Sequence, residues 1–109
     1  MSLQTLLEQE EIHWAAGPRT GGLTKVYCCD LLSIAMSRVP AGGLWVTVMN
    51  NINTLAVASL CEVQAVLLAE GVQPAEALLT RAEKEQITLL TTDLPIYEAA
   101  CLGERHLTD

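Results

Sequence analysis

The sequence has no phenylalanine and few other aromatic residues, with two tryptophans and two tyrosines among 109 residues. It also has no run of about 18 consecutive apolar residues, the length that a membrane-spanning helix needs. The first residues, MSLQTLLEQEE, turn acidic and have no basic cluster ahead of an apolar stretch, unlike a secretory signal peptide. We therefore expect a cytoplasmic protein without a membrane partner.

The cysteines do not have the spacing of a metal site. Cys28, Cys29, Cys61 and Cys101 form no C-x-x-C pair and have no histidine at ligand spacing, so we expect neither a metal nor a cofactor. We expect them to be buried thiols in a reducing compartment. The adjacent pair Cys28–Cys29 leaves one further interpretation, a subunit of a redox complex.

Basic residues are scarce, since six lysines and arginines stand against 13 acidic residues and the net charge is −7. Nucleic acids are bound mainly through clustered cations, so this charge argues against them as partners. The cations are unevenly spread, because residues 12–61 carry Arg19, Lys25 and Arg38 against a single acid, Asp30. We therefore expect any anion-binding site in the first half of the chain.

No catalytic motif is present. Ser33 and Ser59 lack the G-x-S-x-G context of a nucleophile elbow, and there is no dinucleotide-binding fingerprint. We expect His13 to be a half-buried packing residue beside Trp14, and His106 lies in the C-terminal tail. The sequence therefore predicts no catalytic residue and a protein that is not an enzyme.

Half of the residues are hydrophobic, which is enough for one folded domain over residues 1–109. We expect its core at about residues 12–102 and a frayed tail at 103–109. Apolar runs between turn residues predict the following elements. Strands are expected at 12–16, 24–29, 44–49, 63–69 and 87–91, and helices at 2–11, 31–38, 54–62, 75–86 and 94–105.

Strands and helices alternate from residue 44 onward, and the strands are continuous apolar runs. Continuous runs are typical of strands buried on both faces of a parallel sheet. We therefore predict the α/β class, as a single three-layer domain with a mostly parallel sheet of about four to five strands and helices on both faces. In helix 31–38, we expect Leu31, Leu32, Ala35 and Met36 to form an apolar stripe.

The stretch GPRTGGLTK, residues 17–25, has the glycine spacing that opens a Walker A loop. Leu23 stands where that loop has its lysine, and the β-like VYCC follows where a helix should begin, so we reject a Walker A loop. Two interpretations are open. In the first, Gly21 and Gly22 form an anion-binding nest with Arg19 and Thr20 as donors. In the second, the glycines are turn residues of a loop that connects two strands.

Polar residues follow several predicted strands, at the carboxyl edge where open α/β sheets bind ligands. These are Asp30, Asn51, Asn53, Thr92 and Asp93. They are suited to a small polar ligand or to a hard cation such as magnesium. The second interpretation is that each of these residues is a helix cap contributing ~1 kcal/mol, and it is favoured above all for Asp30 and Asp93, which directly precede helices.

The chain resembles a stand-alone DRTGG domain over roughly residues 12–102. The resemblance is carried by an ordered set of segments: PRTGG at 18–22, CDLLSIAM at 29–36, GLWVTV at 43–48, NTLAVASLCEVQAVLLAEG at 53–71 and LLTTDLPIYEAA at 89–100. The sequence departs from the family motif at Pro18, where the family has aspartate, which weakens any ligand role carried over to Arg19 and its neighbours.

The resemblance implies a fold similar to the N-terminal domain of HPr kinase/phosphorylase. DRTGG domains occur beside CBS domains in some family II pyrophosphatases and within some phosphotransacetylases, where they look like regulatory or dimer-forming modules. The resemblance therefore implies a regulatory or ligand-sensing module that binds a partner protein or a small anionic ligand such as a nucleotide.

Self-association is a further expectation, because LLSIAM and LAVASL supply more apolar surface than one small sheet covers. The alternative function is a small enzyme or phosphotransfer subunit, with its site at the carboxyl edge around Asp30, Asn53 and Asp93. Deep convergence of these groups would favour the enzyme, and their use in helix caps would favour the module.

Overall fold

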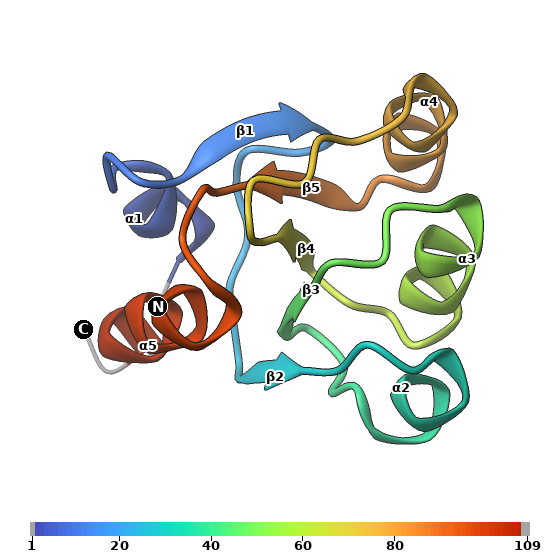
Figure 1. The fold of residues 1–109 in the computed structure, drawn as a ribbon, viewed down its shortest axis with the longest axis horizontal. Coiled ribbons are helices and arrows are strands. Elements are labelled where there is room, and N and C mark those ends of the chain that lie inside the picture. The colour runs from blue at the N-terminus through green and yellow to red at the C-terminus, as the bar shows by residue number, and fades with distance from the viewer. Residues whose placement is uncertain (1, 108–109) are drawn as a thin grey trace.

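The computed structural model describes residues 2–107, which form a five-stranded sheet between two layers of helices (Figure 1). The strand order is β1-β5-β4-β3-β2, with parallel pairing of β2 with β3, β3 with β4 and β4 with β5, and antiparallel pairing of β1 with β5. The predicted α/β fold with a mostly parallel sheet is confirmed. The strands are β1 (His13–Ala16), β2 (Val26–Cys28), β3 (Leu44–Thr47), β4 (Ala65–Leu68) and β5 (Thr88–Thr91).

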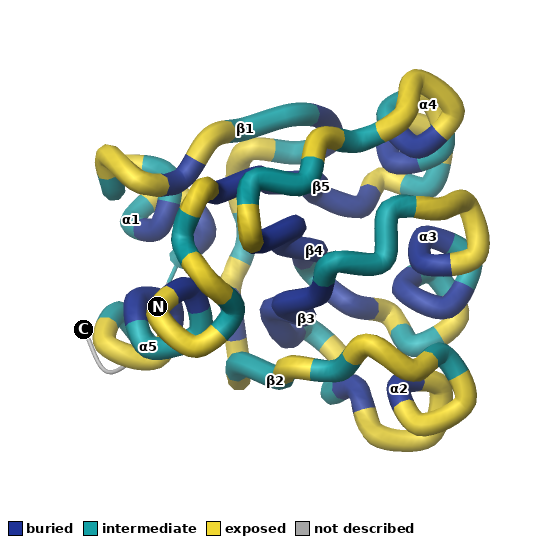
Figure 2. Tube along the Cα trace, in the orientation of Figure 1, coloured by how far each residue is buried: buried dark blue, intermediate teal, exposed yellow. Residues whose placement is uncertain are grey.

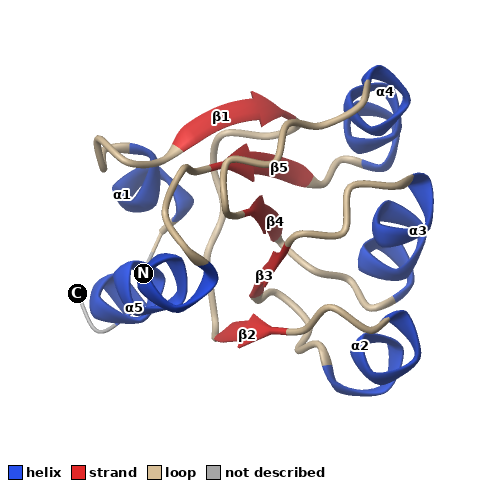
Figure 3. Ribbon diagram, viewed as in Figure 1, coloured by secondary structure: helices blue, strands red, loops and turns tan. Residues whose placement is uncertain are grey.

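The helices divide unequally between the two faces (Figure 3). One face is covered by α2 (Leu32–Arg38), α3 (Ile52–Leu60) and α4 (Glu76–Glu85). The other is covered by α1 (Leu3–Leu7) and α5 (Ile96–Leu107). None of the helices between residues 2 and 107 is both long enough and apolar enough to span a membrane.

The three central strands are buried along their whole length, as the dark blue tube in Figure 2 shows. Successive side chains of a strand point to opposite faces, so each strand supplies two cores. Trp45 and Val66 belong to the core beneath α2, α3 and α4, whereas Leu44 and Leu67 belong to the core beneath α1 and α5. This two-sided burial explains the continuous apolar runs of the sequence.

The folded part of the chain extends beyond the expected limits. Leu3 and Leu6 of α1 are fully buried, so the core begins before residue 12. The α5 helix continues to Leu107, and a Cβ at the buried Gly103 would lie 3.0 Å from a methyl carbon of Leu44. The expectation of a frayed tail is therefore wrong for residues 103–107, because α5 has to cover one face of the sheet. Residues 108 and 109 lie outside the described part of the chain.

Most of the predicted apolar stripe on α2 is not covered by the sheet. Only Ala35 of its four members is buried, Leu32 is half-buried, and Leu31 and Met36 are 55% and 52% exposed. The helix is short and covers the end of the sheet, so little of its surface meets a neighbour.

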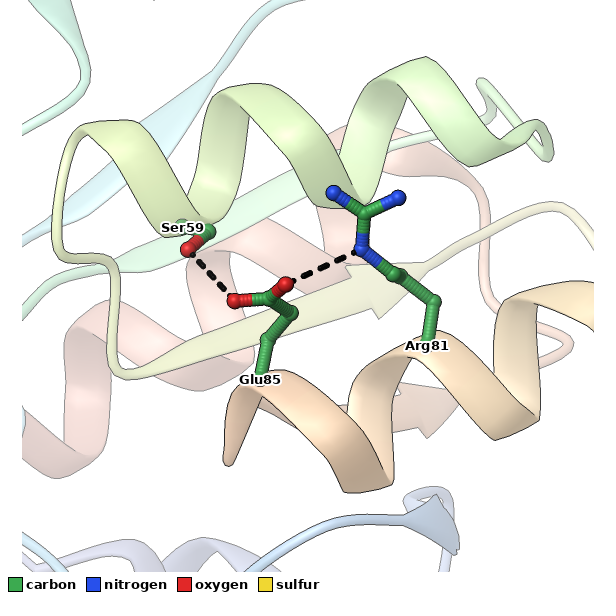
Figure 4. Close-up of polar contacts among 3 residues, drawn as sticks. All are labelled: Ser59, Arg81 and Glu85. Carbon is green, nitrogen blue, oxygen red and sulfur yellow. Dashed lines mark hydrogen bonds and ion pairs between the residues drawn. The ribbon is translucent and has the colours of Figure 1, made fainter.

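A hydrogen-bonded group of side chains connects α3 to α4 (Figure 4). Glu85 accepts a hydrogen bond from the Ser59 hydroxyl at 3.0 Å and one from Nε of Arg81 at 3.1 Å. These bonds, with that of Ser59 the larger influence, lower the pKa of Glu85 below its usual range.

Candidate functional site

The PRTGG loop, residues 17–25, lies at the amino edge of the parallel strands. Gly17 packs against Ile87 and Thr88, where β5 begins, and the Thr88 hydroxyl donates to the carbonyl of Pro18. Thr24 donates its main-chain N–H to Gly42, just before β3. The loop is therefore at the opposite edge of the sheet from the polar residues expected to form a ligand site after the strands.

Gly17 is required by close packing of the loop backbone against β5. Gly17 has a φ of +84°, and a Cβ there would lie 2.1 Å from the carbonyl oxygen of Ile87. The Gly21 carbonyl accepts the main-chain N–H of Leu3 at 2.7 Å, and Gly22 pairs with Ser2. These contacts hold the start of α1 against the loop, which is the behaviour expected of a structural turn.

Lys25 and Arg19 are the two charged, exposed residues of this loop, and Arg19 is the one that lies against an aromatic ring. Its guanidinium carbon lies 3.9 Å from the centre of the Trp14 ring, a distance at which a cation is attracted to the aromatic face. The indole N–H of Trp14 donates to the Gly17 carbonyl at 3.0 Å, which holds the ring in place. Arg19 forms no ion pair with any residue in the 2–107 range, and the neighbouring Thr20 is also exposed.

Asp30 follows β2 but does not cap α2. One carboxylate oxygen accepts hydrogen bonds from the Thr47 hydroxyl at 2.6 Å and from the Val48 N–H at 2.9 Å. The capping position of α2 is Leu31, which has no side-chain cap. The capping interpretation of Asp30 is therefore wrong, because its carboxylate crosses to the end of the adjacent strand β3.

Asn51 caps α3, as the capping interpretation of this edge predicted. Its side-chain oxygen accepts the N–H of Asn53 at 2.9 Å. Asn53 therefore takes part in this cap through its main-chain N–H. The preceding Asn50 bridges to the next loop, accepting the Ala75 N–H at 3.1 Å and donating to the Gln73 carbonyl. The polar turn after β3 is thus joined by hydrogen bonds to the loop that precedes α4.

Glu70 fills the role that the sequence assigned to Asp93. Its carboxylate accepts the N–H of Ile96, the first residue of α5, at 2.8 Å. Thr92 accepts the Leu94 N–H through its hydroxyl at 3.2 Å. The Asp93 carboxylate is exposed and makes no hydrogen bond to the described residues, so the expectation that Asp93 caps α5 is wrong. No local pattern marked Glu70, since the residue that it caps lies 26 positions away.

The crevice between β4 and β5 is closed by hydrogen bonds. The chain leaves β4 toward α4 on one face and β5 toward α5 on the other, which is where a doubly wound sheet would open to a ligand. However, Glu70 and Gly71 donate their N–H groups to the carbonyls of Leu94 at 2.8 Å and Thr92 at 3.0 Å. The two loops are therefore joined across the position where a ligand would enter.

Two hollows flank the segment that follows β5, with volumes of about 510 and 260 Å³. His13 and Asp93 line both of them. His13 is exposed, so the expectation that it packs half-buried is wrong. Glu10 and Glu11 line the smaller hollow, and neither hollow is lined by lysine or arginine. A lining with carboxylates and without lysine or arginine does not favour binding of an anion.

The five polar residues predicted at the carboxyl edge do not gather into one cluster. Asp30 follows β2 and Asp93 follows β5, and two other strands separate these two in the sheet. At a spacing of about 4.8 Å between strands, the two positions are on the order of 14 Å apart. In the described part of the chain, no three His, Cys, Asp or Glu residues lie close enough to hold a metal ion.

The cysteines are less buried than expected. Cys28 is exposed and the other three are partly exposed, and all four are free thiols. The expectation of buried thiols is therefore wrong. Although Cys28 is exposed as a residue, partial desolvation of its thiol raises its pKa, as do, to a smaller extent, the charges of Asp30 and Cys101. A raised pKa lowers the thiolate fraction, which disfavours a nucleophilic role.

Comparison with known proteins shows similarity at the level of the fold. No family model matches the chain, and no curated protein matches its sequence. A solved structure, of the CBS and DRTGG domains of the regulatory region of Clostridium perfringens pyrophosphatase, superposes with a TM-score of 0.75 at 17% sequence identity. The match covers 93% of this chain and 45% of that one, which is complexed with its activator, diadenosine tetraphosphate.

Proposed function

We propose that this chain is a non-catalytic, cytoplasmic regulatory module that senses a small anionic ligand and transmits its presence through self-association or a partner protein. The observation that carries the proposal is that most polar groups at the carboxyl edge of the sheet form structural hydrogen bonds. Asp30, Asn50, Asn51, Glu70 and Thr92 each hold a loop or a helix end. Groups committed to structural hydrogen bonds are poorly placed to act as acids, bases or ligands.

The ligand site that we propose is the exposed surface around Arg19 and Thr20. An arginine fixed over an aromatic ring offers its N–H donors to phosphate in a defined plane, at a low entropic cost. The Thr20 hydroxyl lies next to it in the chain and supplies a further donor. Gly21 packs closely against the Gln64 side chain and Gly22 pairs with Ser2, so the motif acts as a platform for the arginine.

The proposed ligand class is a nucleotide that carries a polyphosphate chain. The related pyrophosphatase region is complexed with diadenosine tetraphosphate, which combines several phosphates with aromatic bases. Phosphate on Arg19 and a base near Trp14 would use both parts of such a ligand. Glu10, Glu11 and Asp93 make the smaller hollow unfavourable for an anion, whereas Trp14, the ring beneath Arg19, lines the larger one.

The test is isothermal titration of the protein with diadenosine tetraphosphate and with ATP. We expect Arg19→Ala to weaken binding by about tenfold or more, the loss expected for one charge-assisted contact of roughly 1.5–3 kcal/mol. Lys25→Ala is the matched control, because it removes a charge from the same loop without an aromatic contact. Unchanged binding by Arg19→Ala, or no binding of either nucleotide by the wild type, would refute the site.

A second candidate function is a small enzyme or phosphotransfer subunit. The observation in its favour is that His13 and Asp93 both line the two hollows at the carboxyl edge. An assay of phosphate release from diadenosine tetraphosphate and ATP measures this enzymatic activity directly. Turnover that is lost in both His13→Ala and Asp93→Asn would replace the regulatory proposal with this one.

A further inference from the structure

The larger of the two hollows is lined by polar side chains that form no hydrogen bond within residues 2–107. These side chains are those of His13, Gln73, Thr91 and Asp93. The carboxylate of Glu70, by contrast, already accepts an N–H of α5. The hydrogen-bonding capacity of the four lining side chains is therefore available to a ligand.

Thr91 gives the clearest indication that this hollow binds a molecule. The residue is only 7% exposed, yet its hydroxyl has no hydrogen-bond partner in the described part of the chain. Between residues 2 and 107, every fully buried side-chain oxygen has a partner, so the Thr91 oxygen is itself accessible, and it lines the hollow. An unpaired hydroxyl at such a depth costs free energy unless a bound molecule satisfies it.

The sheet register brings the polar groups to one face. His13 of β1 is paired with Thr91 of β5, and directly opposed residues of an antiparallel pair have Cβ atoms about 4.5–5.5 Å apart on the same face. Leu89 lies two positions before Thr91 and belongs to the core beneath α4, so Thr91 also points to the α4 side. Asp93 follows the strand beside the loop that leads to α4, where a Cβ at Gly71 would lie 3.4 Å from its carboxylate oxygen (Figure 1).

The charge of the lining favours a cation. The Asp93 carboxylate is exposed and forms no ion pair with a described residue, and neither hollow is lined by lysine or arginine. Glu10 and Glu11 line the smaller hollow, which shares His13 and Asp93 with the larger one. Carboxylates therefore extend from one hollow into the other, with Asp93 at their junction.

An organic cation suits the hollows better than a metal ion. No three His, Cys, Asp or Glu side chains of residues 2–107 lie close enough to hold a metal. Between the carboxylates the walls are apolar, with Ala15, Pro74 and Leu79 in the larger hollow and Leu94 and Pro95 in the smaller one. Such walls pack against methylene groups while charged ends remain in contact with carboxylates and water.

We propose that the two hollows together form a binding site for a linear aliphatic polyamine. One ammonium group lies in the larger hollow and donates to the Thr91 hydroxyl and the Asp93 carboxylate. A second ammonium group lies in the smaller hollow with Glu10 and Glu11, and the methylene chain crosses between them. The volume of the larger hollow, about 510 Å³, is within the range of small-molecule sites. This inference goes beyond the proposed function, because the ligand has the opposite charge and does not use Arg19.

Isothermal titration of the full chain with spermidine tests the inference. We expect binding of one spermidine per chain. Asp93→Asn should weaken it by about tenfold or more, the loss expected for a charge-assisted contact. Thr91→Val keeps the shape of the side chain and should weaken binding roughly fivefold. Glu98→Gln is the matched control, because it removes one negative charge from an exposed position of α5 that lines neither hollow.

The length of the ligand is tested with butylamine, which has a single ammonium group and fills the larger hollow alone. It should bind about tenfold more weakly than spermidine, and the double variant Glu10→Gln/Glu11→Gln should weaken only spermidine. Equal affinities for the two amines would refute a site that spans both hollows.

Three further results would overturn the inference: no binding of spermidine by the wild type, unchanged binding by both Asp93→Asn and Thr91→Val, or an equal loss in Glu98→Gln. Circular dichroism checks that each variant is folded, and Asp93→Asn decides the matter if Thr91→Val is not. Arg19→Ala should not weaken spermidine binding. The failure of this site and the failure of the nucleotide site are therefore distinguishable.

Discussion

Gly17 shows how a single residue fixes the course of the loop between β1 and β2. Its φ of +84° lies in the left-handed region, and its α-carbon is packed against the backbone where β5 begins. Its N–H donates to a carboxylate oxygen of Glu83 at 3.0 Å, which joins the loop to α4. Any side chain at this position would meet main-chain atoms that cannot move independently.

We predict that Gly17→Ala destabilises the fold by about 2–4 kcal/mol, through backbone strain and a clash with the Ile87 carbonyl. Gly71→Ala is the control. Gly71 also has a positive φ, of +73°, but its Cβ would meet only the Asp93 side chain at an ordinary 3.4 Å. We expect that change to cost about 1 kcal/mol. Urea denaturation measures both, and equal costs would show that the close contact at Gly17 is unimportant.

Three buried threonine hydroxyls each donate a hydrogen bond to a loop, which is near in sequence for Thr54 and distant for Thr47 and Thr88. Thr47 donates to Asp30, Thr54 to the Met49 carbonyl and Thr88 to the Pro18 carbonyl. In residues 2–107 no buried side-chain nitrogen or oxygen lacks a hydrogen-bond partner. An unpaired buried polar group costs roughly 1–3 kcal/mol, so these pairings restrict where the loops can lie.

At the scale of elements, α3 and α4 are joined by the contacts of Glu85. Both donors favour the ionised carboxylate, so the pKa of Glu85 is lower in the folded protein than its ordinary value of 4.5. A lowered pKa contributes stability above the unfolded pKa, and this contribution is lost as the pH falls through the folded pKa. The effect is small because the group is exposed to solvent.

We predict that Ser59→Ala lowers the unfolding temperature modestly at neutral pH and that the difference from the wild type disappears in acid. Ser59 provides the largest influence on Glu85, so its removal returns the pKa toward its ordinary value. Thermal unfolding across a pH series measures this. Thr80→Ala is the control, because the Thr80 hydroxyl donates to the Glu76 carbonyl and contacts no carboxylate. A Ser59→Ala difference that is the same at every pH would contradict the prediction.

The start of α5 is also fixed by another element. The Glu70 carboxylate comes from the loop after β4 and accepts the first N–H of the helix. A negative charge at this position also interacts favourably with the helix dipole. The connection between the β4 and β5 loops therefore sets the direction in which α5 leaves the sheet.

At the scale of the whole molecule, stability is concentrated in the centre of the sheet. β3, β4 and β5 are buried along their whole length between two helical layers, whereas β2 and α2 lie at an exposed end. Opening of the central strands requires disruption of both cores. Opening of the β2 end disrupts only the edge of each core, because Tyr27 packs against one and Val26 against the other.

We predict that amide hydrogen exchange is slowest in Trp45, Val66 and Leu89 and much faster in α2. Nuclear magnetic resonance measures this residue by residue. The central amides should exchange only on global unfolding, so their rates should follow the total free energy of unfolding. Slow exchange of α2 in a dilute monomeric sample would contradict the prediction.

The sequence by itself determined the fold class and the order of the elements. Continuous apolar runs such as LWVT and AVLL are suited only to strands covered on both faces, and the helices between them follow from their periodicity and turn residues. The cap at Asn51 was also predictable, because it depends on the residues next to it. These features are local, so the chain around them is sufficient to specify them.

Only the tertiary structure decided which polar groups lie together. The strand order separates Asp30 from Asp93 and places the PRTGG loop at the other edge of the sheet. It also brings Glu70 to the start of α5, and it brings His13 and Asp93 to the same hollows. These contacts join residues far apart in the sequence, and they depend on the order in which strands pair. A single sequence records that order only weakly, because several pairings bury the same apolar runs equally well.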